Sequence, residues 1–459
     1  MRKLLLASAA TMGALLATAG GASAQPLPTK LPAPGTILIH LNGYLQVSIG
    51  DFGSTFNTVK VSGVGTDKLS PVGMIGDFRI YPGFDAQTVS GIDYGAQGEI
   101  RTGYSDAGVG QNGKPTVTTA SSTSSLDSLY VKRAYGYIGT PTYGYARFGQ
   151  TDSAFTLLQN GVVEAFGDGG QWTLEGGVKD LLPSAAAPTS TIIYADQAAV
   201  YSTDKIVYIS PAIAEPFLGG SFSGAAGYEP NSNGLKEGFN ANTGASSTSN
   251  GLSSSNSTSD TGKRRKNTVD AMVQYAWKGN GFATKTSGGI LYGQPVNYDG
   301  IAAPAGAAKY GYDSLEVYQF GSQVTYAGFT LGANIKGGQV EDGYAFKPKG
   351  ARDALTYIIS GNYVVGPYVF GASYFNAQSA GNYIPGAKEG RTLSEYGVAV
   401  GANYVIGKDL SLFTQYMYGH RHQIGNSAFG STAPASGSAF GNGKDSQVQV
   451  IALGATMKW

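Results

Sequence analysis

Residues from 268 to the end of the chain alternate apolar and polar side chains, and this pattern limits the possible folds more than any other feature of the sequence. In the segment TVDAMVQYAW, one face takes Val269, Ala271, Val273, Tyr275 and Trp277, and the other takes Asp270 and Gln274. A period of two residues is typical of β-strands that have an apolar environment on one side and a polar one on the other. The final segment places Ile451, Leu453, Ala455, Met457 and Trp459 on one face in the same way.

Sixteen such strands can be placed along the chain. They are predicted at 37–49, 74–82, 92–104, 129–139, 143–151, 203–211, 217–228, 268–277, 282–293, 318–326, 329–336, 354–365, 367–376, 394–405, 409–421 and 446–459. Their connections alternate between short turns, such as VVGP and IGKD, and long loops, such as 377–393 and 422–444. Short turns at one rim and long loops at the other are typical of bacterial transmembrane antiparallel β-barrels, which have an even number of strands. The sequence therefore predicts an all-β fold, with one transmembrane barrel domain over 37–459.

The N-terminus indicates export. Two basic residues precede an apolar run that extends to about residue 19, and the small-residue pattern ASA follows. This order is typical of a secretory signal peptide. We predict a signal peptide over 1–24, cleaved between Ala24 and Gln25, and a proline-rich leader over 25–36. The apolar run is short for a bilayer-spanning helix of about 20 residues, and no later run reaches 18 apolar residues.

Composition excludes several classes of protein. Without Arg2 and Lys3 the 31 basic side chains fall to 29, against 30 acidic ones, and this balance predicts no nucleic-acid partner. The chain has no cysteine, so it forms no disulfide and offers no thiolate to a metal. Charged residues make up only 13%, about half the usual share of roughly 25%, while Gly and Tyr are abundant. An exported chain that lacks both a soluble and a helical-membrane profile favours a β-barrel.

The cost of charge in lipid decides which face points inward. A Lys or Arg that faces lipid near the bilayer midplane costs about 2–4 kcal/mol. We therefore expect the polar face to line the lumen, including Asp270, Gln274, Asn334 and Lys336. The apolar face then meets lipid or a neighbouring subunit, with an aromatic belt at the strand ends formed by Tyr275, Trp277, Tyr326, Tyr363 and Tyr404.

Residues 129–180 interrupt the pattern. Two predicted strands, joined by the turn TPTYG, place Arg133 and Arg147 on inward faces, and a long segment without strand or helix periodicity follows. A barrel of sixteen strands leaves an aqueous channel wide enough to need an internal constriction. We predict that residues from about 152 to 200 form a constriction loop that folds into the barrel and faces an arginine wall.

The candidate site residues fall into two groups of opposite charge. The basic wall comprises Arg79, Arg101, Arg133, Arg147 and Lys205, and the acidic residues of the loop are Glu164, Asp168, Glu175 and Asp180. Opposite charges on two sides of a narrow lumen would set up a transverse field that orders water and solutes. An ordinary set of solvated or paired lumen charges is the alternative.

Other motifs in the sequence give less evidence about function. The run KRRK at 263–266 closes a Ser/Asn-rich stretch; it is either a solvated charge run or a site for lipopolysaccharide phosphates. His420 and His422 share a strand face, but no third metal ligand is evident nearby. No nucleophile context supports a hydrolase, and phosphate-loop and dinucleotide motifs are absent from the sequence. We expect no enzymatic activity, no cofactor and no bound metal.

Several stretches resemble the general trimeric porins. The segment LYVKRAYGYIGTPTYGYARFGQTDSAF is similar to the strands before their constriction loop, EAFGDGG resembles their acidic loop motif, and IHLNGYLQVSIG resembles a porin first strand. The terminal aromatic, Trp459, is similar to the assembly signal of outer-membrane proteins, although Phe is commoner there. The N-terminal cysteine pair of some members is absent. The best fit is the alphaproteobacterial group of general outer-membrane porins.

The resemblance implies a homotrimer in the Gram-negative outer membrane, in contact with the lipid bilayer and lipopolysaccharide. It implies passive diffusion of small hydrophilic solutes and ions through a water-filled channel. Two other functions stay open from the sequence. One is a solute-specific channel for a sugar or an anion, in which Phe166 and Trp172 would stack on sugar rings; the other is a non-conducting surface adhesin or structural barrel.

Overall fold

The computed structural model describes most of the predicted strands and part of the segment between them. The described residues are 32–55, 58–61, 65–68, 70–105, 130–173, 176–182, 203–215, 218–231, 265–295, 313–340, 344, 346–347, 349–379, 393–423 and 445–459. The predicted signal peptide and its cleavage site lie outside these residues, as do Glu175, the first two residues of the KRRK run and the part of the predicted loop from 183 to about 200.

The barrel is built from seventeen hydrogen-bonded strands in the described part of the chain. They are β1 (Ile37–Ser54), β4 (Val72–Gln87), β5 (Asp93–Ser105), β6 (Tyr130–Thr140), β7 (Gly144–Thr151), β8 (Thr203–Ile209), β9 (Ile213–Glu215), β10 (Gly220–Asn231), β11 (Arg265–Gly279), β12 (Phe282–Pro295), β13 (Leu315–Tyr326), β14 (Phe329–Gln339), β15 (Ala354–Val365), β16 (Tyr368–Ser379), β17 (Leu393–Gly407), β18 (Leu410–Gln423) and β19 (Asp445–Lys458). β8 and β9 follow one another along β10 and occupy a single position, so the barrel has sixteen strand positions. The predicted number and order of strands are confirmed.

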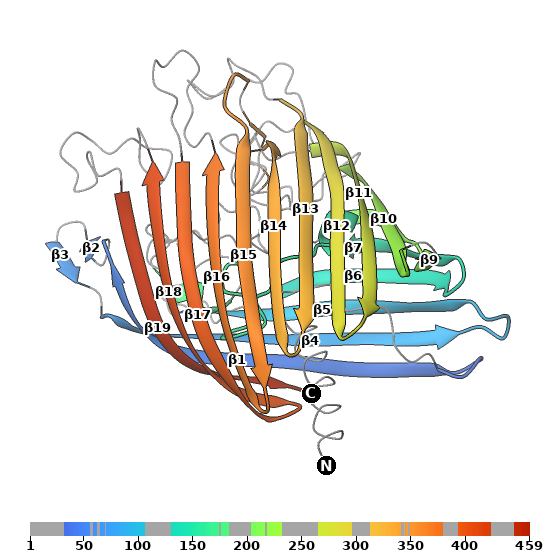
Figure 1. The fold of residues 1–459 in the computed structure, drawn as a ribbon, viewed down its shortest axis with the longest axis horizontal. Coiled ribbons are helices and arrows are strands. Elements are labelled where there is room, and N and C mark those ends of the chain that lie inside the picture. Colours follow the sequence, from blue (N-terminus) through green and yellow to red (C-terminus); the bar gives the residue numbers. More distant parts are fainter. Residues whose placement is uncertain are drawn as a thin grey trace.

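The sheet closes on itself through its first strand. β1 pairs antiparallel with β4 along one edge and with β19 along the other, where Tyr44 lies opposite Lys458. Closure leaves no unpaired edge, the condition for a β-structure to cross a bilayer. Strands β12–β16 cross the direction of β1, β4 and β5 at a steep angle in Figure 1, as expected for opposite walls of a barrel whose strands are tilted.

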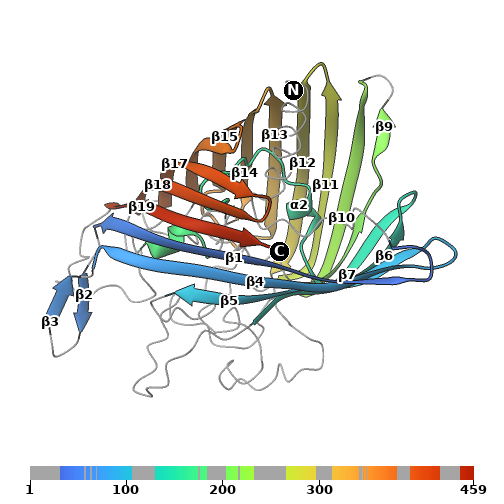
Figure 2. The same ribbon diagram turned by 90° about the horizontal axis from the view of Figure 1, so that it is seen from below.

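A short hairpin lies apart from the barrel wall. β2 (Thr58–Val61) pairs with β3 (Gly65–Lys68) at one rim, next to the end of β1 (Figure 2). None of the sixteen predicted strands lies there, although the sequence left open a further strand within 50–73; each segment has only four residues and is too short to show a clear period. β1 itself runs five residues past its predicted end and ends at Ser54.

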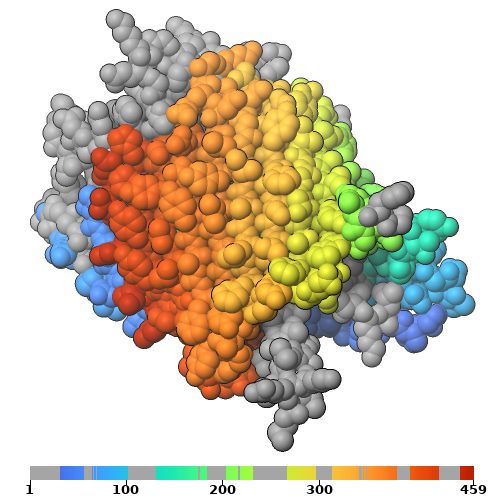
Figure 3. Space-filling model, in the orientation of Figure 1, coloured from blue at the N-terminus to red at the C-terminus, as the bar shows by residue number. Residues whose placement is uncertain are grey.

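The outward face is apolar as predicted. On β19, Ile451 is 57% exposed and Leu453 61%, whereas the intervening Val450 and Ala452 are buried. Figure 3 shows the outside of β11–β19 as one continuous wall, coloured from yellow to red. Aromatic rings meet at the short-turn rim: Phe282 stacks on Tyr326 and Phe329 on Tyr363, each pair with its centroids 4.1 Å apart.

The inward face differs from the expectation of a polar lumen lining. Asp270, Asn334 and Lys336 point inward, but each is at most 5% exposed. Many inward positions of β15–β19 are apolar and fully buried, among them Phe375 and Val450. Both observations have one cause, which is that chain from the segment after β7 lies against this wall. In the part of the chain that the structure describes, no helix is long and apolar enough to cross a membrane.

Candidate functional site

The chain leaves the barrel wall after β7 and turns into the lumen. Asp152 follows the last residue of β7, and α2 (Ala154–Leu157) begins two residues later. The backbone N–H of Phe155 donates to Asp270 Oδ2 of β11 at 2.6 Å. The inward carboxylate of Asp270 therefore fixes the start of the loop.

Polar side chains of successive strands hold the middle of the loop. Each contact joins loop backbone to an inward side chain: Asn334 Nδ2 of β14 donates to Asn160 O at 2.6 Å, Val163 N donates to Ser360 Oγ of β15 at 2.7 Å, Asn403 Nδ2 of β17 donates to Gly167 O at 2.7 Å, and Asp168 N donates to Gln415 Oε1 of β18 at 2.8 Å. An irregular segment has backbone groups that no ladder satisfies, so these bonds remove the cost of burying them. The loop follows the inner wall from β11 to β18.

The end of the described loop reaches the first strands of the barrel. The 3₁₀ helix η1 (Val178–Leu181) lies against β19, β1 and β4. Leu181 fits over Gly50 and Gly73, where any larger side chain would meet it at about 3 Å. At the other end of the described loop, α2 lies against β8, β10, β11 and β12, so the described part of the loop follows the wall from β8 round to β4.

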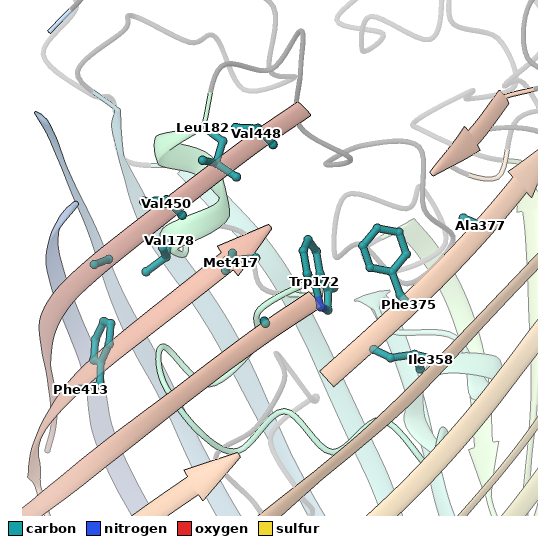
Figure 4. Close-up of a cluster of buried hydrophobic side chains, with 12 residues drawn as sticks. Trp172, Val178, Leu182, Ile358, Phe375, Ala377, Phe413, Met417, Val448 and Val450 are labelled. Atoms are coloured by element: carbon teal, nitrogen blue, oxygen red, sulfur yellow. The ribbon is translucent and has the colours of Figure 1, made fainter. Parts of the chain in front are cut away.

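Apolar packing fixes the loop as firmly as the hydrogen bonds do. Figure 4 shows Trp172, Val178 and Leu182 of the loop among inward side chains of β15–β19, including Phe375 and Val450. The Trp172 and Phe375 rings lie 4.5 Å apart, and Trp172 Nε1 donates to Ser373 Oγ at 3.1 Å. Buried rings of this size contribute a large apolar area.

Glycines in the wall make room for the two large rings of the loop. A Cβ at Gly371 or Gly401 would run into Phe166, and one at Gly397 would run into Trp172. One signal in the sequence could have located the part of the inner wall on which the loop packs. It is the presence of glycine and large apolar side chains at positions where the alternation requires polar ones.

The acidic residues of the loop bind the loop itself. Glu164 accepts hydrogen bonds from Trp172 N at 3.0 Å and from Thr173 Oγ1 at 2.6 Å. Asp168 accepts from Val178 N at 2.8 Å and from Gln171 Nε2 at 3.1 Å. These bonds close the EAFGDGG stretch into a compact turn, so Glu164 and Asp168 serve as structural acceptors inside it.

Burial changes the proton affinity of both carboxyl groups. Removal from water raises the pKa of Glu164 to about 7, although its bonds from Thr173 and Trp172 act in the opposite direction. Burial also raises the pKa of Asp168, against the hydrogen bonds of the Val178 and Gly170 backbone. Asp180 is partly buried, and its Oδ2 accepts a hydrogen bond from Gly176 N at 2.6 Å.

The predicted basic wall is assembled on adjacent strands. Arg79 pairs with Asp77 on β4, and its Nε donates to Asp77 Oδ2 at 2.6 Å. Arg101 and Arg133 both pair with Glu99 of β5. Arg133 Nε also lies 2.8 Å from Asp152 Oδ1, at the point where the loop begins.

The remaining two basic residues continue the wall. Arg147 lies over the ring of Tyr135, with its guanidinium carbon 5.1 Å from the ring centroid, which is a cation–π geometry. Lys205 of β8 donates to Thr151 O at 2.9 Å and lies 3.8 Å from Glu229. The structure thus brings all five predicted basic residues onto β4–β8.

Paired carboxylates reduce the charge of this wall. The four arginines are 1–5% exposed, and Asp77, Glu99 and Asp152 are interleaved with them. The sequence predicted that loop carboxylates face the arginines across the lumen, and the arrangement in the structure is different. Carboxylates of the wall and of the loop's first residue neutralise most of the arginine charge, while Glu164 and Asp168 are bound within the loop.

The two histidines of β18 lie outside the lumen. His422 Nδ1 is 2.7 Å and His420 Nε2 is 3.4 Å from Asp445 Oδ1, on the outward side of the wall. Over the described ranges, no group of three or more His, Asp or Glu side chains could hold a metal ion.

A comparison with protein families gives one match. The model of a family described as Gram-negative porin matches residues 7–423. No curated protein matches the chain.

Solved structures of similar architecture are distant in sequence. The anion-selective porin from Comamonas acidovorans is 12% identical with a TM-score of 0.49, and the match covers 92% of this chain and 100% of that one. OmpF of Salmonella typhi, in complex with daunomycin, is 14% identical with a TM-score of 0.47, over 92% and 97% of the two chains. The trimer form of OmpT, an outer-membrane protein of Vibrio cholerae, is 13% identical with a TM-score of 0.44, over 92% and 99%.

Proposed function

The chain belongs to the Gram-negative porin family, and from this premise we propose that it forms a water-filled channel through which small hydrophilic solutes and ions diffuse passively. The observation that carries the proposal is the loop of residues 152–182, which lies inside a closed barrel and is bonded to β11, β14, β15, β17 and β18. A barrel of sixteen strand positions is wide enough for an aqueous channel, and a loop fixed inside it narrows that channel.

The finer assignments are part of the same proposal. We place the channel in the outer membrane, in contact with lipopolysaccharide, after removal of residues 1–24, and we propose a homotrimer and an alphaproteobacterial origin. The apolar outer wall is the evidence for a location in a lipid bilayer, and the sequence of the first residues is the evidence for export. No enzymatic role is proposed, since the charged residues of the wall pair with one another and no nucleophile and base meet among them.

Support for the trimer from small outward residues is weaker than the sequence suggested. The sequence offers Gly43, Gly76, Ala96 and Gly98 as a small-residue patch at which subunits could pack. The structure gives Gly43 another role, because the Trp459 ring of the same chain occupies the space that its Cβ would need. The trimer is therefore proposed on family membership.

A sugar-specific channel is less favoured. That alternative needs Phe166 and Trp172 to stack on solute rings, but both side chains are 1% exposed and pack against the barrel wall.

Conductance of the purified protein in a planar bilayer tests the proposal. A passive channel gives discrete steps whose size rises in proportion to salt concentration and does not saturate with any one solute. Block that saturates with a single solute would support a specific channel instead. Absence of steps from folded protein would support the non-conducting barrel and contradict the proposal.

A further inference from the structure

A second segment enters the lumen between β14 and β15. Tyr344 and Phe346 of this connection are each 1% exposed, although a side chain that faced a water-filled lumen would be wet. The Tyr344 ring meets Phe155 of α2 edge to face, with centroids 6.4 Å apart and planes at 89°. The connection therefore packs on the beginning of the constriction loop.

The wall beneath these rings is apolar as well. Inward side chains of β11, β12 and β13 complete the cluster, namely Met272, Leu291, Leu315 and Val317, and each is at most 1% exposed. Apart from Gln319, Lys336 and the Tyr344 hydroxyl, the lining is aliphatic and aromatic carbon, which offers water few polar partners. This sector of the lumen is dry.

One buried lysine contacts both of these aromatic side chains. Lys336 Nζ of β14 donates to the Tyr344 hydroxyl at 3.2 Å, and it lies 5.3 Å from the Phe155 centroid and 5.9 Å from the Tyr344 centroid. Cation–π contacts strengthen when both partners are removed from water. Tyr344 has a φ of 63°, which costs a non-glycine residue free energy, and its contacts with Lys336 and Phe155 offset that cost.

A second lysine ties the same connection to the neighbouring strand. Lys347 Nζ lies 2.9 Å from Asp313 Oδ2 and 3.1 Å from Asp353 Oδ1, and it donates to Ala351 O at 2.7 Å. Asp313 N donates in turn to Lys347 O at 3.0 Å. Burial acts to lower the pKa of Lys347, but the bonds to the two carboxylates outweigh it and raise that pKa. These contacts hold the connection directly after the Tyr344–Phe346 stretch.

We propose that Phe155, Tyr344 and Phe346 form a second, apolar constriction that closes the lumen under β11–β15 and, with the loop of residues 152–182, determines the size limit of the channel. This inference rests on the proposed function, since a size limit has meaning only for a channel.

The first test measures conductance and the exclusion limit for neutral polyethylene glycols. The Tyr344→Ala/Phe346→Ala variant removes two rings from the lumen and should raise single-channel conductance by about 1.3- to 2-fold and admit larger polymers. The matched control is Tyr318→Ala/Phe320→Ala on β13, whose rings are 52% and 56% exposed on the outside. Parental conductance in the lumen variant, with folding verified by heat-modifiable mobility, would overturn the proposal.

The second test needs only single substitutions and uses the absence of native cysteine. A thiol at Phe346→Cys should react with a charged, membrane-impermeant reagent at least about tenfold more slowly than one at Lys285→Cys, an exposed inward position on β12. Equal rates would overturn the second constriction even if the channel conducts. If the parent does not conduct, the proposed function fails, and the thiol rates still decide whether this sector is closed.

Discussion

At the scale of single residues, the site is a set of paired charges. Arg133 illustrates this, because it contacts Glu99 of the wall and Asp152 at the start of the loop. The sequence placed this arginine on the correct face by alternation alone. It could not show the pairing, because Glu99 and Arg133 lie 34 residues apart and meet only through the register of β5 and β6.

Removal of one wall arginine should change ion selectivity. Arg133→Ala takes away one of four positive charges beside three carboxylates, so the reversal potential should shift toward cation preference. A shift on the order of 10 mV is expected under a tenfold KCl gradient, against a ceiling of about 59 mV for a monovalent ion. Lys408→Ala is the control, because it removes the same charge from an exposed turn. Equal shifts of the reversal potential in the two variants would show that the arginine wall does not determine ion selectivity.

Glu164 should make the stability of the loop depend on pH. Its pKa in the folded protein is raised to about 7 by burial, from an ordinary value of 4.5, so the packed loop prefers the protonated group. The contribution of Glu164 to the stability of the folded protein is therefore greatest below about pH 4.5. It falls as the pH rises toward 7 and stays low above that pH. Glu164→Gln lacks the titration, so its melting temperature relative to the parent should rise between pH 5 and pH 8. A difference independent of pH would contradict the assignment.

At the scale of elements, strands could be predicted and the loop could not. A strand such as β14 repeats its environment every two residues, and that repetition is visible in the sequence. The path of residues 152–182 depends instead on contacts with strands more than 100 residues away, such as Phe155 with Asp270. The same contacts explain why Phe375 and Val450, which break the expected polar face, are buried under the loop.

A single methyl group should disturb the loop's seat. At Gly371 an added Cβ would collide with the Phe166 ring, so Gly371→Ala should lower the free energy of unfolding in detergent by about 1–3 kcal/mol and increase current noise. At Gly407, in the adjacent strand, an added Cβ would meet open space. Gly407→Ala should therefore change the free energy of unfolding by less than about 0.5 kcal/mol. Similar effects of the two substitutions would mean that Phe166 is not seated at Gly371.

At the scale of the whole molecule, closure of the barrel joins the two ends of the sheet. Gly43 and Trp459 exchange two backbone hydrogen bonds of 3.1 and 3.2 Å, and the Trp459 ring lies 5.9 Å from that of Phe78. The chain's last residue thereby completes the seam between β1 and β19. The number of strand positions could be predicted, because each one repeats the same local pattern; the dry sectors of the lumen could not, because they arise where distant segments meet.

Loss of the terminal ring should weaken this seam. Trp459→Ala removes the packing on Gly43 and Phe78 but keeps the backbone bonds, so the barrel should still form with a lower melting temperature. Because the ring is half exposed, the free energy of unfolding should fall by about 1–3 kcal/mol, which is less than for loss of a fully buried aromatic side chain. Trp459→Phe, which keeps a ring, should recover most of the loss. An unchanged melting temperature would leave the ring without a role in closure.

Swelling of liposomes that contain the purified protein measures directly whether neutral solutes diffuse through it. If the protein is a passive channel narrowed by its inward loops, neutral sugars enter at rates that fall steadily with molecular size, rise in proportion to concentration, and do not differ between stereoisomers. Swelling no faster than in protein-free liposomes, or a rate that saturates for one sugar alone, would contradict the account.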